Sequence, residues 1–228
     1  MKDIDLLEND ALLLVEQNFY FLQTGSFFSA LAKEYPLVTM GKIDISKSFG
    51  EHEYQFNTFI IHEMLEDMHT TSKDELVLFE YFVEMNAFRG ICMAMVEALR
   101  LDGDFKIFIE EKLNLQYEDF FDLLSFVRNV LSHNIHADIY LDRKDYEGTH
   151  QKRLRQHRGS KIQFDFKYAT HLPQMKAPSI EYGFSSTIDL DSLKEDTAFL
   201  DVLSLWELMM ISELCFNLVL SYKLSSES

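Results

Sequence analysis

The chain has 228 residues, of which 47% are hydrophobic and 14% aromatic, so it can bury a core and is not composed like a disordered protein. With only 8 glycines and 3 prolines, it favours long helices over a turn-rich β-sandwich. The formal charge of −17 argues against nucleic-acid binding over the whole surface, because an acidic protein repels a polyanion.

The cysteines and the N-terminal residues indicate a cellular compartment. Cys92 and Cys215 lie within apolar helical patterns, and the absence of any CxxC motif or disulfide framework indicates a reducing compartment. The first ten residues, MKDIDLLEND, are acidic where a signal peptide would be basic. No apolar run approaches the roughly 20 residues that cross a bilayer. We therefore expect a cytoplasmic protein without a membrane partner.

In the first half of the chain, the hydrophobic spacing predicts three helices. They are expected at residues 6–33, 53–69 and 73–100. A capping box of Ser72 and Glu75 begins the third helix, and Gly103 is expected to end it as a C-terminal glycine. A short amphipathic stretch at 104–114 then leads to a further helix, which we expect at 117–133.

Beyond residue 134 the hydrophobic period changes from helical to alternating. Strands are predicted at 135–141, 161–168 and 184–190, and a final helix at 195–222. The first two strands are expected to form an antiparallel pair joined by a basic loop. The predicted fold class is mainly α: a helical bundle with a small antiparallel β excursion before the C-terminal helix. We expect one domain over 1–228 with a β-rich insertion at 135–190.

The loop predicted at 150–161, HQKRLRQHRGSK, concentrates positive charge and contains no acidic residue. Its cations are Lys152, Arg153, Arg155, Arg158 and Lys161. Such a run is often a solvated loop, and this interpretation stays open. The functional interpretation is an RNA-binding arm that contacts phosphates on an otherwise acidic body.

The helix predicted at 117–133 has two distinct faces on a helical wheel. The face expected in the core carries Phe120, Leu123, Leu124, Val127 and Leu131. The opposite face carries Asp122, Ser125, Asn129, Ser132 and His133, which are small or polar where an exposed face usually has long charged residues. We expect this face to be a wet interface or a cleft. Ser125 and Ser132 would form a dimer face, buried against a second copy or against another helix of the same chain.

The end of this helix carries a motif at residues 128–133, RNVLSH, of the form R-N-x-x-x-H. It is similar to the R-x4-6-H motif of the HEPN superfamily, in which a polar residue, often Asn, commonly follows the Arg. The position of the motif also resembles that family, since it ends a helix that follows a long helix. The resemblance covers about residues 74–136 and implies a HEPN-like helical bundle.

The resemblance also implies an activity: metal-independent endoribonuclease cleavage of RNA, with no cofactor, in a symmetric homodimer whose motif helices share one cleft. His133 would move the proton in attack by the ribose 2′-OH, and Arg128 would bind the scissile phosphate. Asn129 would orient the histidine or contact the substrate. The family setting implies prokaryotic defence or a toxin–antitoxin system, with an inhibitory antitoxin-like protein as partner.

The chemistry of the residues agrees with these roles. Histidine as a residue type exchanges protons near neutral pH, and arginine stays charged and offers a planar fork to phosphate oxygens. Asn129 and His133 are four residues apart and share a helix face. Arg128 and His133 are five apart, about 140° around a helix, so the spacing favours a site to which two helices contribute.

Two alternatives remain, and a possible metal site is set aside. His133 and Asn134 could simply finish the helix, because a cation suits a helix C-terminus and Asn tolerates a left-handed turn. A metal site at His133, His136 and Asp138 has suitable residue types but no further cluster to complete it. The protein could also be a non-catalytic acidic helical dimer that acts as a protein-binding or regulatory module. The charge of −17 is the observation that suggests this alternative.

Overall fold

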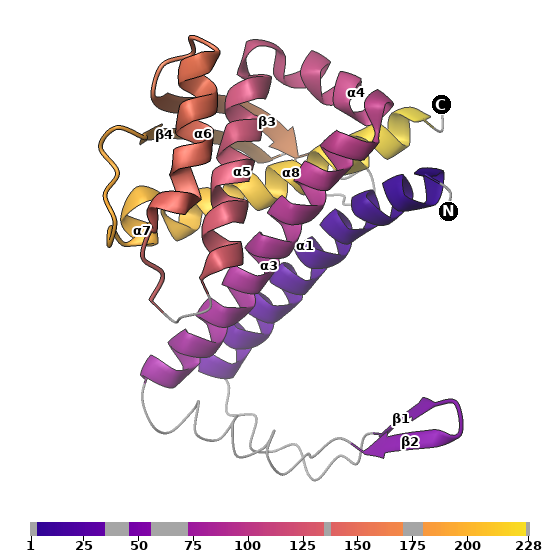
Figure 1. Ribbon diagram of the computed structural model, residues 1–228. Helices are drawn as coiled ribbons and strands as arrows, with labels where there is room; N and C mark the ends of the chain where they lie inside the picture. Colours follow the sequence, from indigo (N-terminus) through magenta and orange to yellow (C-terminus); the bar gives the residue numbers. More distant parts are fainter. Residues whose placement is uncertain (1–3, 35–45, 56–72, 135–137, 171–179, 227–228) are drawn as a thin grey trace. The chain divides into compact units, whose positions relative to one another are not determined.

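The computed structural model describes residues 4–34, 46–55, 73–134, 138–170 and 180–226. Within these ranges most residues are helical, and the strands form short antiparallel pairs (Figure 1). The pair β3 (Lys161–Thr170) and β4 (Ile180–Asp189) precedes the last helix. The predicted fold class, mainly α with a small antiparallel β excursion before the C-terminal helix, is confirmed.

The chain divides into two compact units, which we describe separately. The first comprises Met1–Phe21 with Met85–Ser228, and the second comprises Leu22–Glu84. The sequence predicts one domain over 1–228 and does not indicate this division. The reason is local: α1 (Ile4–Glu34) and α3 (Lys73–Leu101) each run past the boundary as unbroken helices, so no linker-like composition marks it.

The second unit contains a hairpin of β1 (Ser46–Phe49) and β2 (His52–Gln55), in which Phe49 lies opposite His52. Gly50 makes the turn with φ +63°, a conformation that glycine adopts without steric cost. The helix predicted at 53–69 is therefore wrong at its beginning, where the chain is a strand. The rest of that range lies outside the described residues, as does the predicted cap Ser72.

In the first unit, α1 packs against α3 and α8 (Leu205–Ser226). The rings of Phe19 on α1 and Phe216 on α8 stack with centroids 4.4 Å apart. A Cβ atom added to Gly90 of α3 would lie 2.0 Å from Oδ1 of Asn18 on α1, so a side chain at this position would have to displace the Asn18 amide.

The predicted helix at 195–222 is instead two helices, α7 (Phe199–Val202) and α8. Ser204 and Glu207 cap the second of these. The backbone N–H and the hydroxyl of Ser204 both donate to Glu207 Oε2, at 2.8 and 2.7 Å, and the Glu207 N–H donates back to Ser204 Oγ. This reciprocal capping box begins α8 and explains the break in the chain before it.

The sequence predicts no segment that crosses a membrane, and the length and composition of α8 have to be compared with this expectation. Its residues Leu205–Ser225 are long and apolar enough to cross a membrane by length and composition, although half of the most apolar window is buried inside the fold. The buried side chains include Ile211, Leu214, Cys215 and Val219. In this structure α8 is a core helix of the first unit.

Helix α4 (Gly103–Leu113) follows α3 and corrects the prediction for Gly103. This glycine is the first residue of α4, and the carboxylate of Asp102 caps the helix by accepting from the Phe105 N–H at 2.8 Å. A 3-10 turn, η2 (Asn114–Gln116), leads to α5 (Tyr117–His133). The bounds of α5 are those predicted.

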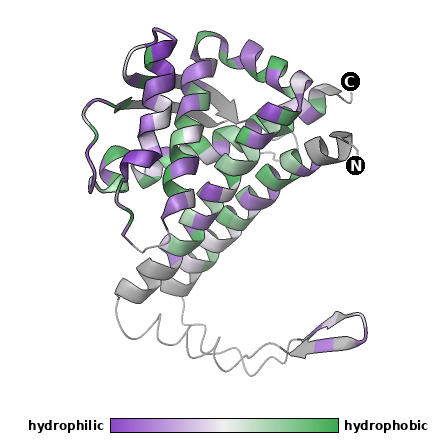
Figure 2. Cartoon of the chain, viewed as in Figure 1, coloured by the Kyte–Doolittle hydropathy of each residue, from purple (hydrophilic) through white to green (hydrophobic). Residues whose placement is uncertain are grey.

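The segment before β3 differs most from the prediction. The basic run is not a loop between two strands, because α6 (Arg143–Arg155) contains its first half, with Lys152, Arg153 and Arg155. Figure 2 shows α6 as largely hydrophilic. In the strand predicted at 135–141, residues 135–137 lie outside the described residues, and Tyr140 forms only an isolated bridge with Ala198. The partner of β3 is β4, with Ile162 opposite Ile188.

Cys92 and Cys215 are both free and buried. Burial raises the pKa of Cys92 to about 12, and burial together with the neighbouring Cys92 thiol raises the pKa of Cys215 well above its usual value. Because the thiolate is the reactive form, we expect neither cysteine to react with a thiol reagent at pH 8 in the native chain. Both should react after denaturation, as a colorimetric thiol titration would measure. Rapid native labelling of either residue would contradict this expectation.

Candidate functional site

Helix α5 presents both predicted faces. The apolar face is confirmed: Phe120, Leu123, Leu124, Val127 and Leu131 are fully buried. The polar face lies against α6, which runs beside α5 in Figure 1 and is joined to it by hydrogen bonds. A helix of the same chain thus contacts this face at Asp122, Asn129 and His133, but it does not fully bury Ser125 and Ser132, and their contact with a second copy stays a prediction. Ser132 is exposed and Ser125 is half-buried.

His133, the last residue of α5, is held by an acidic residue of α6. Its Nδ1 lies 2.8 Å from Oδ1 of Asp145. The Asp145 side chain is 0% exposed, whereas the His133 side chain is 42% exposed. With Asp145 as a carboxylate, Nδ1–H donates to it, and Nε2 is then the ring nitrogen that carries the free lone pair. The histidine is thus oriented by a buried acid while part of its ring faces solvent.

Asp145 is itself fixed by the beginning of α6. Its Oδ2 accepts from the backbone N–H of Asp142 at 2.8 Å, so each carboxylate oxygen has a donor. Asp142 and Asp145 together form the capping box of α6. Asp145 is not among the candidate residues that the sequence motif indicates. The sequence signal for it is the spacing Asp142-x-x-Asp145, a helix-start pattern inside a segment where the hydrophobic pattern predicts strand and loop.

Asn129 connects the histidine to the arginine of the motif. Its Nδ2 donates to the backbone oxygen of Asp145 at 3.3 Å, and its Oδ1 accepts from Nη2 of Arg128 at 2.9 Å. The three predicted catalytic residues, Arg128, Asn129 and His133, are therefore joined through Asp145 within one chain. The five-residue spacing between Arg128 and His133 is bridged by the amide of Asn129 and the first turn of α6.

Asn134 ends α5 without the left-handed turn that the sequence allowed. Its backbone is extended, with φ −113°, and its Nδ2 donates to the carbonyl oxygen of Val130 at 2.8 Å. Nη2 of Arg89 on α3 donates to the Asn134 carbonyl at 3.1 Å. The end of the helix is thus capped by Asn134 and Arg89, and His133 is left to contact Asp145.

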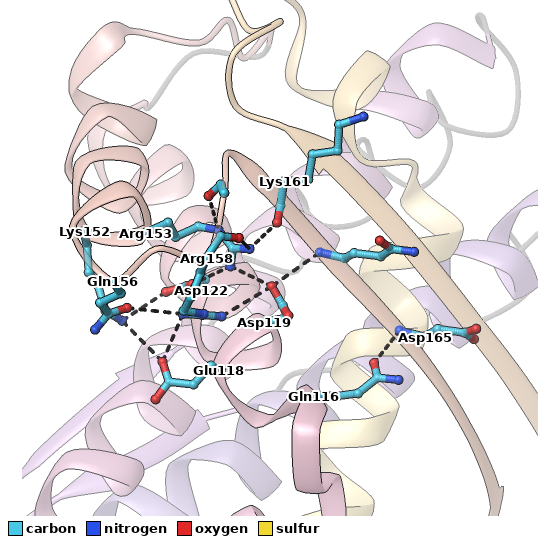
Figure 3. Close-up of polar contacts among 12 residues, drawn as sticks. Gln116, Glu118, Asp119, Asp122, Lys152, Arg153, Gln156, Arg158, Lys161 and Asp165 are labelled. Carbon is cyan, nitrogen blue, oxygen red and sulfur yellow. Dashed lines mark hydrogen bonds and ion pairs between the residues drawn. The ribbon is translucent and has the colours of Figure 1, made fainter.

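Most of the cations of the basic run are bound by acidic residues of α5 (Figure 3). Asp122 is 1% exposed and accepts from three side chains: Lys152 at 3.0 Å, Arg153 at 2.8 Å and Arg158 at 2.7 Å. Arg153 also pairs with Asp119 at 2.6 Å. We call this group, with Glu118, the ion-pair cluster. It contains three acids and three cations, so their charges balance.

Arg153 is the centre of the cluster. Its side chain is 3% exposed, and it also donates to the backbone carbonyls of Gly159, Arg158 and Lys161. These bonds hold the turn between α6 and β3. These internal acceptors enclose the guanidinium of Arg153, which leaves it few donors for the predicted RNA contact.

The other members of the predicted RNA-binding arm differ in exposure. Lys152 and Arg158 are partly buried in the cluster. Arg155 is exposed and donates from Nε to the Gln151 carbonyl, and Lys161 is exposed and lies 3.4 Å from Asp189. The sequence could not indicate this pairing, because the acids that neutralise the run lie about 30 residues earlier on α5. RNA binding by the exposed members stays a prediction.

In the described part of the chain, no group of three or more His, Cys, Asp or Glu side chains gathers as metal ligands would. His136, one member of the suggested trio, lies outside the described residues.

Comparison with models of protein families, with curated proteins and with solved structures finds no match to this chain.

Proposed function

We propose that the protein is a metal-independent endoribonuclease of HEPN type, with His133 and Arg128 as catalytic residues. The observation that carries the proposal is the His133–Asp145 pair, in which a buried carboxylate orients a partly exposed imidazole at 2.8 Å. A histidine that only finished a helix would need no such partner. A carboxylate on one ring nitrogen leaves the other nitrogen ready to take a proton, which is the arrangement of a general base.

In the proposed reaction, Nε2 of His133 removes the proton from a ribose 2′-OH. The 2′ oxygen then bonds to the adjacent phosphorus, and the bond from phosphorus to the 5′ oxygen breaks. The departing 5′ oxygen takes up a proton, either from the imidazolium or from water. The products are one RNA end with a 2′,3′-cyclic phosphate and one with a 5′-hydroxyl. No metal enters these steps.

Arg128 has the chemistry to bind the phosphate under attack. Its guanidinium is only half-buried, and Asn129 accepts one of its five N–H donors. Binding that phosphate would stabilise the negative charge that grows on its oxygens. In this proposal Asn129 positions Arg128 through its Oδ1 and holds the first turn of α6 through its Nδ2.

The biological setting follows from the resemblance to the HEPN motif alone. We propose a cytoplasmic role in prokaryotic defence or a toxin–antitoxin system, with RNA as substrate, a homodimeric state and an inhibitory antitoxin-like protein. An inhibitor would suit a site whose histidine is already oriented, because nothing in the His133–Asp145 pair has to rearrange before proton transfer.

The test is incubation of the purified chain with total RNA in EDTA at low salt. We expect cleavage products with 2′,3′-cyclic phosphate and 5′-hydroxyl ends, since the nucleophile is the neighbouring 2′ oxygen. An oligonucleotide with a single 2′-deoxy substitution at the cleaved position should resist, and this is the matched control. Cleavage that requires a divalent metal, or that leaves 5′-phosphate ends, would contradict the mechanism.

A second candidate function is a non-catalytic acidic module that binds a basic protein. One observation favours it: the ion-pair cluster neutralises Lys152, Arg153 and Arg158 internally, so the basic run offers little attraction for RNA on a chain of charge −17. Under this alternative, total RNA stays intact under every condition, and a basic partner binds with an affinity that falls as salt rises.

A further inference from the structure

Strand β4 forms one edge of its hairpin, and every second residue along it directs its backbone N–H and C=O away from β3. The bond from the Leu190 N–H to the Ser160 carbonyl, at 3.1 Å, fixes which residues these are. In an antiparallel pair, residues that bond each other across the pair alternate with residues that do not. The register is continuous, so the odd-numbered residues of β4 do not bond β3. Between residues 183 and 188 these are Gly183, Ser185 and Thr187, which we call the β4 edge.

The opposite edge of the hairpin agrees with this alternation and is already covered. The N–H of Asp165 on β3 donates to Oε1 of Gln116 at 2.6 Å (Figure 3), and the N–H of Gln163 donates to Oδ1 of Asp119 at 3.5 Å. Both of these β3 residues lie opposite members of the β4 edge. The outward groups of β3 thus have partners on η2 and α5. Within the described residues, the N–H and C=O groups of the β4 edge have none.

The β4 edge lacks the features with which proteins usually protect such edges. Natural edge strands carry proline, bulges or charged side chains, or are very short. Strand β4 has ten residues, its register with β3 has no bulge, and the edge residues are small, uncharged and exposed. A Cβ atom added to Gly183 would meet nothing within 4 Å, so the space beside this residue is open. An extended chain can therefore lie along the edge and complete its hydrogen bonds.

We propose that the β4 edge binds an extended basic segment of another protein, which adds to the hairpin as a third strand. The backbone groups of the edge supply the affinity for such a segment. Its charge follows from residues 189–196, DLDSLKED, which continue from the strand and carry four acids against one lysine. A second copy of the chain is disfavoured as the occupant, because it would bring the same acids and the same charge of −17 to the contact.

Amide hydrogen exchange of the free chain, followed residue by residue by NMR, tests whether the edge is open. The N–H groups of Ser186 and Ile188 are bonded to β3, whereas those of Ser185 and Thr187 point outward. We expect the outward pair to exchange at least about tenfold faster, because an unbonded amide exchanges without any opening of the strand. Slow exchange of Ser185 and Thr187 in the dilute free chain would overturn the proposal. Slow exchange that appears only as the chain is concentrated would place a second copy at the edge, which also overturns it.

The probe for the partner is a capped peptide of alternating lysine and valine, at roughly 0.05 M salt and up to about 1 mM peptide. At saturation it should slow exchange at Ser185 and Thr187 by about tenfold or more. Two N-methylated forms, one at every lysine nitrogen and one at every valine nitrogen, are matched controls that keep the charge and the side chains. One of them removes the N–H groups that face β4 and should bind at least about tenfold more weakly, since each lost bond weakens binding about 2–10-fold.

Two outcomes with these peptides would overturn the proposal. If both methylated forms bind as tightly as the parent peptide, no strand is added to β4. A form with glutamate in place of lysine should bind at least about tenfold more weakly, because it repels the acids beyond the strand. If this form binds as tightly as the lysine peptide, the partner is not basic.

The Ser185→Pro variant removes an outward N–H and keeps the bonds to β3, because proline is tolerated on an edge strand where its nitrogen faces away from the ladder. It should bind the lysine–valine peptide at least about tenfold more weakly than the wild type. Ser185→Thr is the matched control, because threonine keeps the N–H and favours a strand, so it should bind like the wild type. Equal binding by Ser185→Pro would overturn the proposal. If this variant does not fold, as far-UV circular dichroism would show, the methylated peptides decide the question with the wild-type chain.

The proposal goes beyond the proposed function and can fail separately from it. A chain that cleaves RNA but does not bind the peptide overturns the proposal and keeps the nuclease. A chain that binds the peptide without cleaving RNA does the reverse. A basic protein that binds Ser185→Pro as tightly as the wild type would keep the second candidate function and place its contact outside the β4 edge.

Discussion

The His133→Ala variant is expected to cleave RNA about 10²–10⁴-fold more slowly than the wild type, the usual contribution of a general acid–base group. His133 ends α5 and is 42% exposed, so its removal opens no cavity in the core. His133→Gln is a closer replacement, because the glutamine amide can still donate to Asp145 but cannot exchange a proton at neutral pH. Both variants should lose activity and keep the far-UV circular dichroism of the wild type.

Asp145→Asn tests the orientation of the ring rather than its presence. The asparagine amide can donate to Nδ1 of His133, so the ring would keep its proton on Nε2 and lose the lone pair needed there. We expect a loss of activity in the same range, about 10²–10⁴-fold, with the histidine still in place. Nitrogen NMR shifts of the His133 ring should report the exchanged tautomer, an effect that a purely structural role for Asp145 would not produce.

Asp138→Asn is the matched control, because Asp138 is an exposed acid beyond the end of α5. It should leave both cleavage and the His133 tautomer unchanged.

Arg128→Ala should also remove cleavage, since the phosphate would lose its cation. EDTA-resistant cleavage by His133→Ala at the wild-type rate would end the nuclease assignment. An unchanged tautomer in Asp145→Asn would end the orienting role of Asp145 alone.

The second large effect is expected on stability. Asp122→Ala should lower the free energy of unfolding by about 3–5 kcal/mol, because it removes one partner of a buried ion pair and leaves the other charge enclosed. The enclosed charge is the guanidinium of Arg153, which is 3% exposed and would keep only Asp119 among its acidic partners. Lys152 and Arg158 would lose their contacts of 3.0 and 2.7 Å with the same carboxylate.

Glu118→Ala provides the matched comparison. Glu118 belongs to the same cluster and lies 3.1 Å from Arg158, but its side chain is 51% exposed, and exposed ion pairs contribute about 0–1 kcal/mol. Urea denaturation of the two variants, followed by circular dichroism, would measure the difference. If Asp122→Ala costs no more than Glu118→Ala, the cluster does not secure α6 to α5. Asp145 lies on α6, which the cluster attaches to α5. A partial loss of RNA cleavage in Asp122→Ala would agree with this attachment.

Several features of the fold could be predicted from residues near one another in the chain. The bounds of α5 and its buried face, from Phe120 to Leu131, follow from a helical repeat that neighbouring residues set by themselves. The β excursion before α8 was also correctly predicted, although the partner of β3 was not, because alternation marks a strand without stating its neighbour. The break before α8 was missed because its signal, Ser204 with Glu207, lies inside a continuous apolar pattern.

The candidate site shows the same limit more sharply. The local pattern of residues is enough to place Arg128, Asn129 and His133 at the end of an amphipathic helix with a polar face. The partners of that face follow from the folding of distant segments, because Asp145 reaches His133 from twelve residues away and Arg153 reaches Asp122 from thirty-one residues away. Helical periodicity arises from hydrogen bonds four residues apart, so it can be recognised from residues that are close together in the sequence. A carboxylate that orients a histidine, or that neutralises a basic run, is selected by how two helices pack, and that packing depends on the whole first unit.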